Sequence, residues 1–427
     1  MLDLRLIRED PEAVVGALAR RDPAHESAIR EIVGLDERRR EALTRVNALK
    51  AERNRVSREV GERKRAGEAA DDLIRAMREV GEEIGALDRE VAEAEAGIET
   101  RLLGLPNLPL PEVPDGGAEQ NRVESTWGAP PAFDFEPRPH WEIGEALGIL
   151  DLPAGARMAG SGFPVLVGAG ARLQRALIDL FLDRHTGTGG YTEVRVPYLV
   201  NRDALTGTGQ LPKFADESYL TERDDLWLIP TAEVPVTNLH RDELLPVERL
   251  PVLYTAYSPC FRREAGAAGK DTRGLLRVHQ FDKVELVRYE LPERSREALE
   301  TLTREAEALL EMLGLHYRRV LLAAGDLGFS AAMTWDLEVY APGVGQWLEV
   351  SSCSLFTDFQ ARRANLRFRR SQSEKPEFVH TLNGSALALP RVMAALLETH
   401  QRADGTVDLP EPVREYTGAA RLTRAEE

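Results

Sequence analysis

The stretch from Phe261 to Glu285 reads FRREAGAAGKDTRGLLRVHQFDKVE, and it predicts two β-strands joined by a long basic loop. The runs that flank the loop are apolar and aromatic with partial alternation, as strands of a sheet require. Rigid strands would hold Arg262, Glu264 and Glu285 at fixed positions, as a charged site needs. Glycines loosen the loop backbone and cationic side chains suit a phosphate-bearing ligand; these residues are Gly266, Gly269, Gly274, Lys270, Arg273 and Arg277. A solvated hairpin with surface arginines is the alternative.

The composition is that of a globular protein with room for more than one domain. The chain has 427 residues, of which 43% are hydrophobic and 30% charged, which is enough for two or three domains. Its net charge of −16 argues against nucleic-acid binding driven by overall charge, so a polyanion would need a local basic patch. No run of about eighteen apolar residues occurs, and the charged N-terminus does not resemble a signal peptide. We therefore expect no membrane contact and a cytoplasmic location.

The cysteines and histidines do not indicate a metal site. The two cysteines, Cys260 and Cys353, lie in separate apolar contexts, and the eight histidines never cluster at ligand spacing. We therefore expect no structural zinc site and interpret both thiols as core residues.

The N-terminal part of the chain predicts a helical hairpin. Apolar positions step by alternating threes and fours over residues 32–60 and again over 73–98. The interruption at 64–69, which contains Gly67, separates the two series. Two matched seams of this kind are typical of an antiparallel coiled coil.

Charge on the predicted arm is uneven. Residues 36–65 hold eleven Lys or Arg against six Asp or Glu, whereas residues 71–101 hold four against ten. Pairing between helices of opposite sign explains part of this difference. A basic cluster near the tip exceeds what pairing needs, and we interpret it as a phosphate-binding surface: Arg53, Arg55, Arg58, Arg63, Lys64 and Arg65.

A proline-rich segment marks the entry to a second domain. Eight prolines fall between residues 106 and 139, which excludes a continuous helix there. Residues 206–214 form a glycine-containing loop of the kind that closes over a site. The further expected elements are helices at 171–185 and 293–315, an extended run at 191–200 broken by Pro197, and strands at 317–322, 334–340 and 346–351.

Three segments of this second domain resemble one enzyme class. Phe-Arg-x-Glu at 261–264, with the arginine-bearing loop and His279-Gln280-Phe281, resembles motif 2 of the class II aminoacyl-tRNA synthetases, here 254–287. The helix and extended run at 171–200 resemble motif 1, and Gly384 to Pro390-Arg391, within 380–398, resembles motif 3.

The detailed pattern is similar to that of the seryl-tRNA synthetase family. EAGxxGxDTRGLxRxHQF in the motif 2 loop is the variant of that family, and the resemblance extends over essentially the whole chain. Thr231-Ala232-Glu233 matches the family's amino-acid-binding segment, and residues 358–363 also resemble the family.

The resemblance implies an α+β fold and a domain plan. Residues 1–105 would form a tRNA-binding domain with a coiled-coil arm at about 30–100, and residues 106–139 a linker. Residues 140–427 would form a class II catalytic domain on an antiparallel β-sheet flanked by helices. Motif 1 would form the interface of a homodimer, and the arm would grip tRNA across that dimer.

The implied activity is that of an aminoacyl-tRNA ligase. It would activate L-serine with ATP to seryl-adenylate and pyrophosphate, then transfer serine to the 3′ end of tRNA(Ser). The family also serylates tRNA(Sec) where that pathway exists. Whether this chain does so stays open.

The resemblance also implies residue roles. Arg262 would bridge the serine carboxylate and the α-phosphate, as a planar guanidinium can, and Arg391 would hold the γ-phosphate. Glu264 would meet the adenine amino group, Phe281 would stack on the ring, and Glu349 with Ser352 would hold Mg²⁺ against the phosphates. The implied serine-binding residues are Thr231, Ala232, Glu233, Arg262, Glu285, Asn383 and Ser385. The implied ATP-binding residues are Arg262, Arg263, Glu264, Arg277, Val278, Phe281, Glu349, Val350, Ser351, Ser352 and Arg391.

Buried carboxylates at Glu233 and Glu285 would require a cationic ligand between them, because repulsion and desolvation otherwise protonate one of them. Which of the two meets the serine ammonium and which the hydroxyl stays open.

Three alternatives to the seryl family are disfavoured by the sequence. A small amino acid:carrier protein ligase lacks a full tRNA-binding arm, which this chain has. A non-catalytic RNA-binding paralogue is expected to have lost Arg262, Glu285 or Arg391, and all three are present. A sister synthetase for another small amino acid is disfavoured by the Thr-Ala-Glu segment and by the lack of zinc-ligand spacing.

Overall fold

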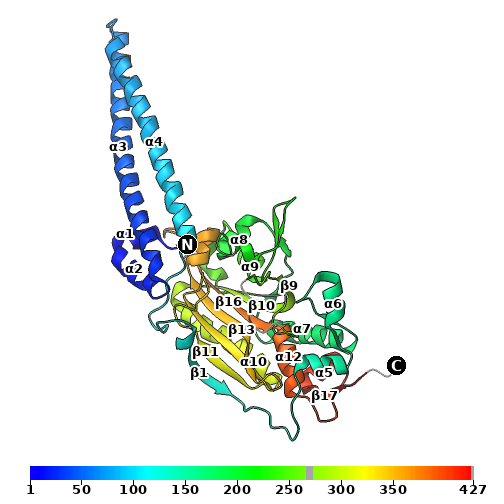
Figure 1. The fold of residues 1–427 in the computed structure, drawn as a ribbon. Coiled ribbons are helices and arrows are strands. Elements are labelled where there is room, and N and C mark those ends of the chain that lie inside the picture. Colours follow the sequence, from blue (N-terminus) through cyan, green and yellow to red (C-terminus); the bar gives the residue numbers. More distant parts are fainter. Residues whose placement is uncertain (266–272, 425–427) are drawn as a thin grey trace. The chain divides into compact units, whose positions relative to one another are not determined.

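The structure, a computed structural model, describes residues 1–265 and 273–424. Its internal contacts divide the chain into two compact units, residues 2–105 and residues 106–427, with Met1 assigned to the second. The first unit is helical and the second is built on a mainly antiparallel sheet, so the expected α+β fold class is confirmed (Figure 1).

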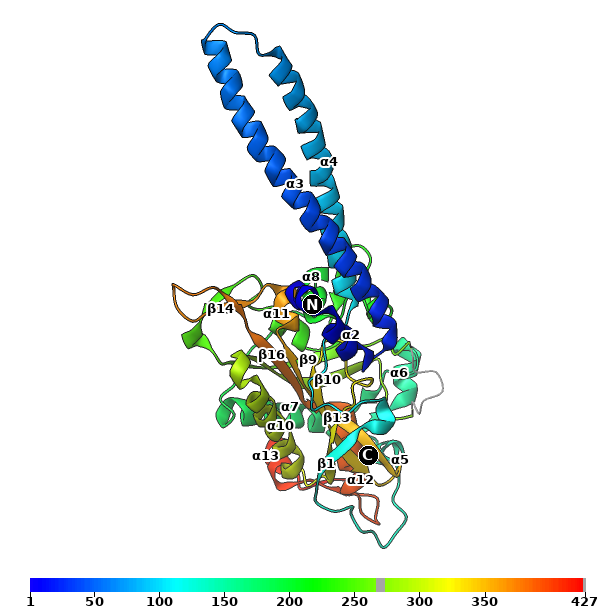
Figure 2. The same cartoon turned by 90° about the vertical axis from the view of Figure 1, so that its left-hand side faces the viewer.

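The first unit is dominated by two long helices. It contains α1 (Leu4–Glu9), α2 (Pro11–Ala19), α3 (Glu26–Arg65) and α4 (Asp71–Gly104). Figures 1 and 2 both show α3 and α4 side by side as an antiparallel hairpin. The predicted seams are buried between them, for example at Ile32, Val46 and Val56 in α3 and at Ile84 and Val91 in α4. The predicted coiled coil is confirmed.

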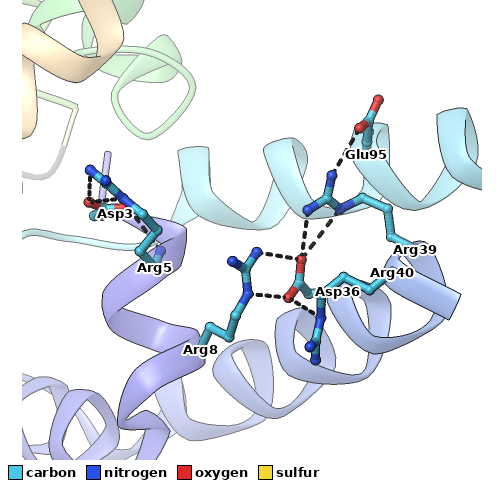
Figure 3. Close-up of polar contacts among 7 residues, drawn as sticks. All are labelled: Asp3, Arg5, Arg8, Asp36, Arg39, Arg40 and Glu95. Carbon is cyan, nitrogen blue, oxygen red and sulfur yellow. Dashed lines mark hydrogen bonds and ion pairs between the residues drawn. The ribbon is translucent and has the colours of Figure 1, made fainter. Parts of the chain in front are cut away.

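A buried carboxylate ties the base of this hairpin to the first helix. Asp36 is only 2% exposed, and Figure 3 shows three arginines converging on it. Arg8 donates two hydrogen bonds of 2.8 and 3.0 Å, Arg39 binds at 3.0 Å and Arg40 at 3.2 Å. Arg39 also reaches Glu95 of α4 at 3.2 Å. The cluster therefore joins α1, α3 and α4 by charge, beside the buried apolar side chains of Ile7 and Ile32.

Opposite charges pair along the flanks of the hairpin. Arg45 lies 3.0 Å from Glu83, and Lys50 lies 3.2 Å from Asp88. These exposed pairs account for part of the uneven charge, although each contributes little stability.

The second unit is organised around an eight-stranded sheet. The strand order is β1-β11-β12-β13-β16-β10-β9-β4, and every neighbouring pair is antiparallel except β4 with β9. The strands are β1 (Arg122–Trp127), β4 (Thr192–Glu193), β9 (Val252–Phe261), β10 (Gln280–Glu290), β11 (Tyr317–Leu321), β12 (Met333–Ala341), β13 (Gln346–Thr357) and β16 (His380–Ala388). Shorter strands form small satellite sheets: β2 (Leu150–Asp151), β3 (Val165–Leu166), β5 (Leu199–Val200), β6 (Leu220–Thr221), β7 (Leu226–Leu228), β8 (Leu244–Pro246), β14 (Arg367–Arg369), β15 (Glu377–Phe378), β17 (Val407–Asp408) and β18 (Arg421–Leu422).

Helices cover both faces of the sheet. They are α5 (His140–Ala146), α6 (Leu152–Ala159), α7 (Ala169–Gly187), α8 (Arg202–Thr208), α9 (Glu233–Thr237), α10 (Ser295–Met312), α11 (Phe359–Ala364), α12 (Leu389–Thr399) and α13 (Glu411–Thr417). The long helix α10 packs against β13 and β16 (Figure 2). A side chain at Gly384 would place its Cβ 2.3 Å from Leu302 of α10, so this position needs glycine for close packing. The neighbours Asn383 and Ser385 consequently face away from α10.

Several predicted segments differ in detail from the structure. The proline-rich segment contains β1, an exposed strand that joins the sheet through backbone pairing with β11 and so carries no apolar alternation. The extended run at 191–200 is two short strands, because Pro197 has no N–H for a continuous ladder. The last three residues of α8, 206–208, occupy the start of the predicted loop 206–214. Gly266, Gly269 and Lys270, expected in the motif 2 loop, lie outside the described residues.

Across residues 1–265 and 273–424, no helix is long and apolar enough to cross a membrane.

Candidate active site

A cavity of about 530 Å³ opens beside the central strands of the sheet. Segments far apart in sequence contribute to its wall, and most residues predicted to bind serine or ATP are among them. Those residues are Thr231, Glu233, Arg262, Glu264, Arg277, Val278, Phe281, Glu349, Val350, Ser351, Ser352, Asn383, Ser385 and Arg391.

Strand periodicity explains why these polar side chains converge. Side chains of a strand alternate between its faces, so Phe281, Lys283 and Glu285 of β10 lie on one face. In the neighbouring strand β16, Ser385 pairs directly with Glu285. Gly384 separates Ser385 from Asn383 and faces α10 instead. Two adjacent strands therefore present one continuous polar strip to the cavity.

The Asn383 amide of this strip joins Glu285 of β10 to Glu233 of α9. The side-chain nitrogen of Asn383 donates to Glu233 at 3.0 Å and to Glu285 at 2.9 Å. Gln360 donates to the other oxygen of Glu233 at 2.6 Å, and Lys283 lies 2.7 Å from Glu285. The Oδ1 atom of Asn383 is buried and accepts no hydrogen bond from the described residues.

The two carboxylates are not equivalent. The chain supplies its own cation, Lys283, to Glu285, which corrects the expectation that both require an external cation. Glu233 receives neutral amides instead, and burial, followed by repulsion from Glu285, raises its pKa to about 7. Glu233 is thus the carboxylate whose ionised form has no directly bound cation among residues 1–265 and 273–424. A cationic ligand group beside it would relieve this cost.

The arginines of the cavity are held by carbonyl oxygens and an aromatic ring. The guanidinium of Arg262 lies 5.2 Å from the ring centre of Phe281 and donates to the carbonyl of Pro230 at 3.4 Å. Arg391 donates to the carbonyls of Leu276 at 3.0 Å and Glu349 at 2.9 Å. Both positive groups are therefore fixed on the cavity wall before any ligand arrives, which is the preorganisation that binding of an anion needs.

Glu264 and Arg277 form an ion pair across the two limbs of motif 2. Both side chains line the cavity. The carboxylate predicted to meet adenine is therefore engaged by Arg277 in the ligand-free structure, and Glu264 holds a left-handed backbone conformation with φ 49°.

A β-bulge brings Glu349 and Ser352 to the same face. Positions three apart in a regular strand face opposite ways. Here Leu337 of β12 pairs with Ser351 while Glu338 pairs with Glu349, so Val350 is an extra residue. Both side chains then line the cavity, from the middle of β13 rather than from the expected end of a strand.

The environment of this pair fits a hard cation. Asp336 stands opposite Ser352 in the ladder and is 8% exposed. Its Oδ1 atom has no hydrogen-bond partner among the described residues, and burial, followed by Glu349, raises the pKa of its carboxyl. Oxygen ligands with an unpartnered carboxylate oxygen close by are the donor set that Mg²⁺ prefers.

Three predicted residues do not line the cavity. Ala232 is fully buried before α9, and Glu285 is fully buried behind the wall, where Asn383 and Lys283 contact it. Arg263 points elsewhere and donates to the carbonyl of Asp216 at 3.3 Å. Its ATP-binding role therefore has no support in the geometry of the cavity.

Sequence reasoning missed Lys283 and Gln360. Lys283 had a usable signal, since it lies midway between Phe281 and Glu285 on the same strand face. Gln360 lies in the segment 358–363 that resembles the family, but no role was assigned to it, because its contact with Glu233 joins residues 127 positions apart.

Part of the basic cluster at the tip of the arm is paired locally. Arg55 binds Glu52 at 2.6 Å, and Arg63 binds Glu59 at 2.9 Å. Arg65 donates to the carbonyl of Gly61 at 3.1 Å. Within the described residues, no ion pair involves Arg53, Arg58 or Lys64, and all three are exposed.

Comparisons with known proteins cover the whole chain. A family model described as the seryl-tRNA synthetase N-terminal domain matches residues 1–109, and one described as the class II tRNA synthetase core domain (G, H, P, S and T) matches residues 217–400. A serine–tRNA ligase of Gemmatimonas aurantiaca is 55% identical over 424 residues, covering 99% of this chain and all of that protein. The chain belongs to the seryl-tRNA synthetase family.

Solved structures of the seryl-tRNA synthetase family have the same fold. Seryl-tRNA synthetase from Pyrococcus horikoshii, complexed with ATP, superposes with a TM-score of 0.96 at 41% identity over the full length of both chains. The cytoplasmic serine–tRNA ligase of Naegleria fowleri, in complex with AMP, gives 0.90 at 27% identity, covering 100% of this chain and 99% of that one. The resemblance and the enzyme class predicted from the motifs, an aminoacyl-tRNA ligase for serine, are confirmed.

Proposed function

We propose that this chain activates L-serine with ATP in its cavity and transfers the serine to the 3′ end of tRNA(Ser). A serine carboxylate oxygen would attack the α-phosphorus, forming seryl-adenylate as the bond to pyrophosphate breaks. Both reactants are anions, so the site must neutralise repulsion and align them. Arg262, which directly follows β9, and Arg391 of α12 are both held on the cavity wall and supply the positive charge.

The polar strip supports serine as the amino acid. Glu233 favours an ammonium group, and the unpartnered Oδ1 of Asn383 favours a donor such as an ammonium or hydroxyl. Thr231 and Ser385 add hydroxyl groups to the same wall. A site that hydrogen-bonds a hydroxyl can reject alanine by about 10⁴ or more, because its buried groups would be left unpaired.

Magnesium belongs with the nucleotide in this proposal. Glu349 and Ser352 would hold it, and Asp336 stands beside Ser352. When bound, the ion would neutralise charge on the phosphates. The side chains of Phe281, Glu264 and Arg277 line the same wall, which supports a role for them in contacting the nucleotide base and phosphates.

The N-terminal arm is proposed to bind tRNA. The protein is strongly acidic overall, so the exposed side chains of Arg53, Arg58 and Lys64 form the local basic surface that a polyanion needs. We further propose a cytoplasmic homodimer with motif 1 at its interface. Whether this chain also serylates tRNA(Sec) depends on whether the organism has the selenocysteine pathway.

A panel assay tests the amino-acid specificity. Serine-dependent exchange of pyrophosphate into ATP should exceed exchange with alanine, glycine, cysteine or threonine. Alanine is rejected for lack of a hydroxyl, whereas threonine is excluded only sterically, at about 1–3 kcal/mol for one methyl. Stronger exchange with any of these four than with serine would refute the proposal.

A triple substitution of Arg53, Arg58 and Lys64 to alanine tests the arm. It should weaken tRNA charging and leave pyrophosphate exchange unchanged. The slope of the logarithm of tRNA affinity against the logarithm of salt concentration should become shallower by roughly 0.7–0.9 for each lost phosphate contact. Arg45→Ala with Lys50→Ala is the matched control, because those cations already pair with Glu83 and Asp88. Equal effects of both variants on charging would contradict a specific role for the tip.

A further inference from the structure

A fully buried carboxylate gathers three segments next to the cavity. Glu398, near the end of α12, is 0% exposed. One oxygen accepts the backbone N–H of His140 at 2.9 Å and contacts Nδ1 of its ring at 2.7 Å. The other oxygen accepts the N–H groups of Gly343 at 2.8 Å and Val344 at 3.1 Å. The contacts join α12, the start of α5 and the β12–β13 turn.

These contacts fix the tautomer of His140. A carboxylate only accepts hydrogen bonds, so Nδ1 carries the proton. Nε2 is then an acceptor, and it receives the backbone N–H of Leu275 at 2.9 Å. The ring is 0% exposed, so no water competes for either nitrogen. His140 thus links Glu398 to the limb of the motif 2 loop that returns to β10.

The residues around Leu275 are fitted to this anchor. Gly274 has φ +67°, and a Cβ there would lie 2.3 Å from Nε2 of His140. The guanidinium of Arg273 stacks over Trp141, the next residue of α5, at 4.8 Å. Beyond the anchor, the carbonyl of Leu276 accepts the 3.0 Å hydrogen bond of Arg391. Leu275, Leu276 and Arg277 all line the cavity.

The same helix therefore carries a phosphate-binding candidate and the anchor. Arg391 lies in the first turn of α12 and Glu398 near its end. Arg391 donates a hydrogen bond directly to the carbonyl of Leu276. Glu398 is linked to the N–H of Leu275 through the ring of His140. Together, the two contacts fix the position and the orientation of residues 275–277 on the cavity wall.

We propose that His140, held by Glu398, is a positioning residue for ATP: it sets the returning limb of the motif 2 loop, residues 273–277, so that Arg277 and Arg391 face the nucleotide. The proposal rests on the ATP-binding role proposed above for the cavity. His140 itself does not line the cavity, and the serine side of the site lies on β10, β16 and α9. Its loss should therefore affect ATP and spare serine.

Substituting His140 with asparagine or with glutamine distinguishes a role in positioning the loop from a role in packing alone. Glutamine places its carbonyl near the position of Nε2, whereas asparagine reaches only the position of Nδ1. In pyrophosphate exchange, H140N should raise KM for ATP about tenfold, the effect of one lost buried hydrogen bond, with KM for serine within about twofold. H140Q should recover KM for ATP to within about threefold of wild type.

Two further measurements keep the proposal testable if H140N folds poorly. G274A should raise KM for ATP selectively, because its Cβ displaces the limb from His140. Hydrogen exchange of the peptide containing Leu275 should be faster in H140N than in wild type or H140Q. This readout needs no catalysis, so it still decides the proposal if wild type shows no serine-dependent exchange and the proposed function fails.

The control is H316Q, which removes the 2.7 Å contact of another buried histidine ring, directly before β11, with the carbonyl of Trp127. It should leave both KM values unchanged. Equal rises of KM for ATP and serine in H140N, failure of glutamine to restore ATP binding, or unchanged protection of Leu275 would each overturn the proposal.

Discussion

Arg262 and Arg263 are neighbours in the sequence, but only Arg262 lines the cavity. We expect R262A to abolish serine-dependent pyrophosphate exchange while leaving the fold intact, because it removes the cation proposed to lie between the two anionic reactants. R263A is the matched control, since its side chain donates to Asp216 outside the cavity. Exchange by R262A within about tenfold of wild type would end this assignment.

The pH dependence of serine binding reports on Glu233. Its pKa is raised to about 7, first by burial and then by Glu285. In the ligand-free protein the carboxyl therefore gains a proton as the pH falls through about 7, and the neutral acid attracts the serine ammonium less. We expect KM for serine to rise from about pH 8 to about pH 6, while KM for ATP changes less.

The comparison for this titration is E233Q, which carries no charge at any pH. Its KM for serine should be raised throughout and should lose most of the pH dependence. A wild-type KM for serine that stays flat across the same range would show that Glu233 does not titrate there.

At the scale of the element, the helical hairpin depends on charge at its base. Asp36 is buried among Arg8, Arg39 and Arg40, and replacing it leaves three guanidinium groups without their shared partner. We expect D36A to destabilise the first unit by about 2 kcal/mol, measured as unfolding followed by helical circular dichroism. D88A, which removes an exposed pair with Lys50, should cost less than about 1 kcal/mol.

The same contacts give this effect a pH dependence. The hydrogen bonds from Arg8 hold the pKa of Asp36 below its ordinary value, with a further contribution from Arg39. Because the unfolded value is about 3.9, the stabilisation is complete above it and is lost as the pH falls through the lower folded value. The stability difference between wild type and D36A should therefore shrink in acid; a constant difference would contradict this linkage.

Sequence periodicity was sufficient for the long elements. The seams of α3 and α4 alternate by threes and fours, and the apolar runs of β9 and β10 flank a basic loop, so both could be predicted without a structure. The short strand β1 could not, because all six of its residues are exposed, and it joins the sheet through backbone pairing with β11 and one ring contact, between Trp127 and Tyr317.

The candidate site divides in a similar way. Residues with a motif, such as Arg262 and Arg391, were found from the sequence. Gln360 and His140 were not found, because their roles arise from contacts across 127 and 258 positions. The bulge at Val350 also leaves no local signal, since only the register with β12 reveals the extra residue.

At the scale of the molecule, the two units predict separable activities. Residues 2–105 and 106–427 are compact by themselves, and every cavity residue belongs to the second. We expect deletion of residues 36–98 to spare pyrophosphate exchange and to abolish charging of tRNA(Ser). The measurement is both assays on one preparation, and undiminished charging by the armless protein would refute the role of the arm.

The extra residue in β13 determines which mutations the cavity wall can tolerate. The side chains of residues 351–355 have their direction set by this one extra residue. Deleting that residue would turn Ser352 and Ser354 towards the apolar core beneath α10. It would bring Cys353 and Leu355 into the cavity. No single replacement of a side chain achieves such an inversion, so the oxygen-lined wall is robust to point mutation and vulnerable to the loss of one codon.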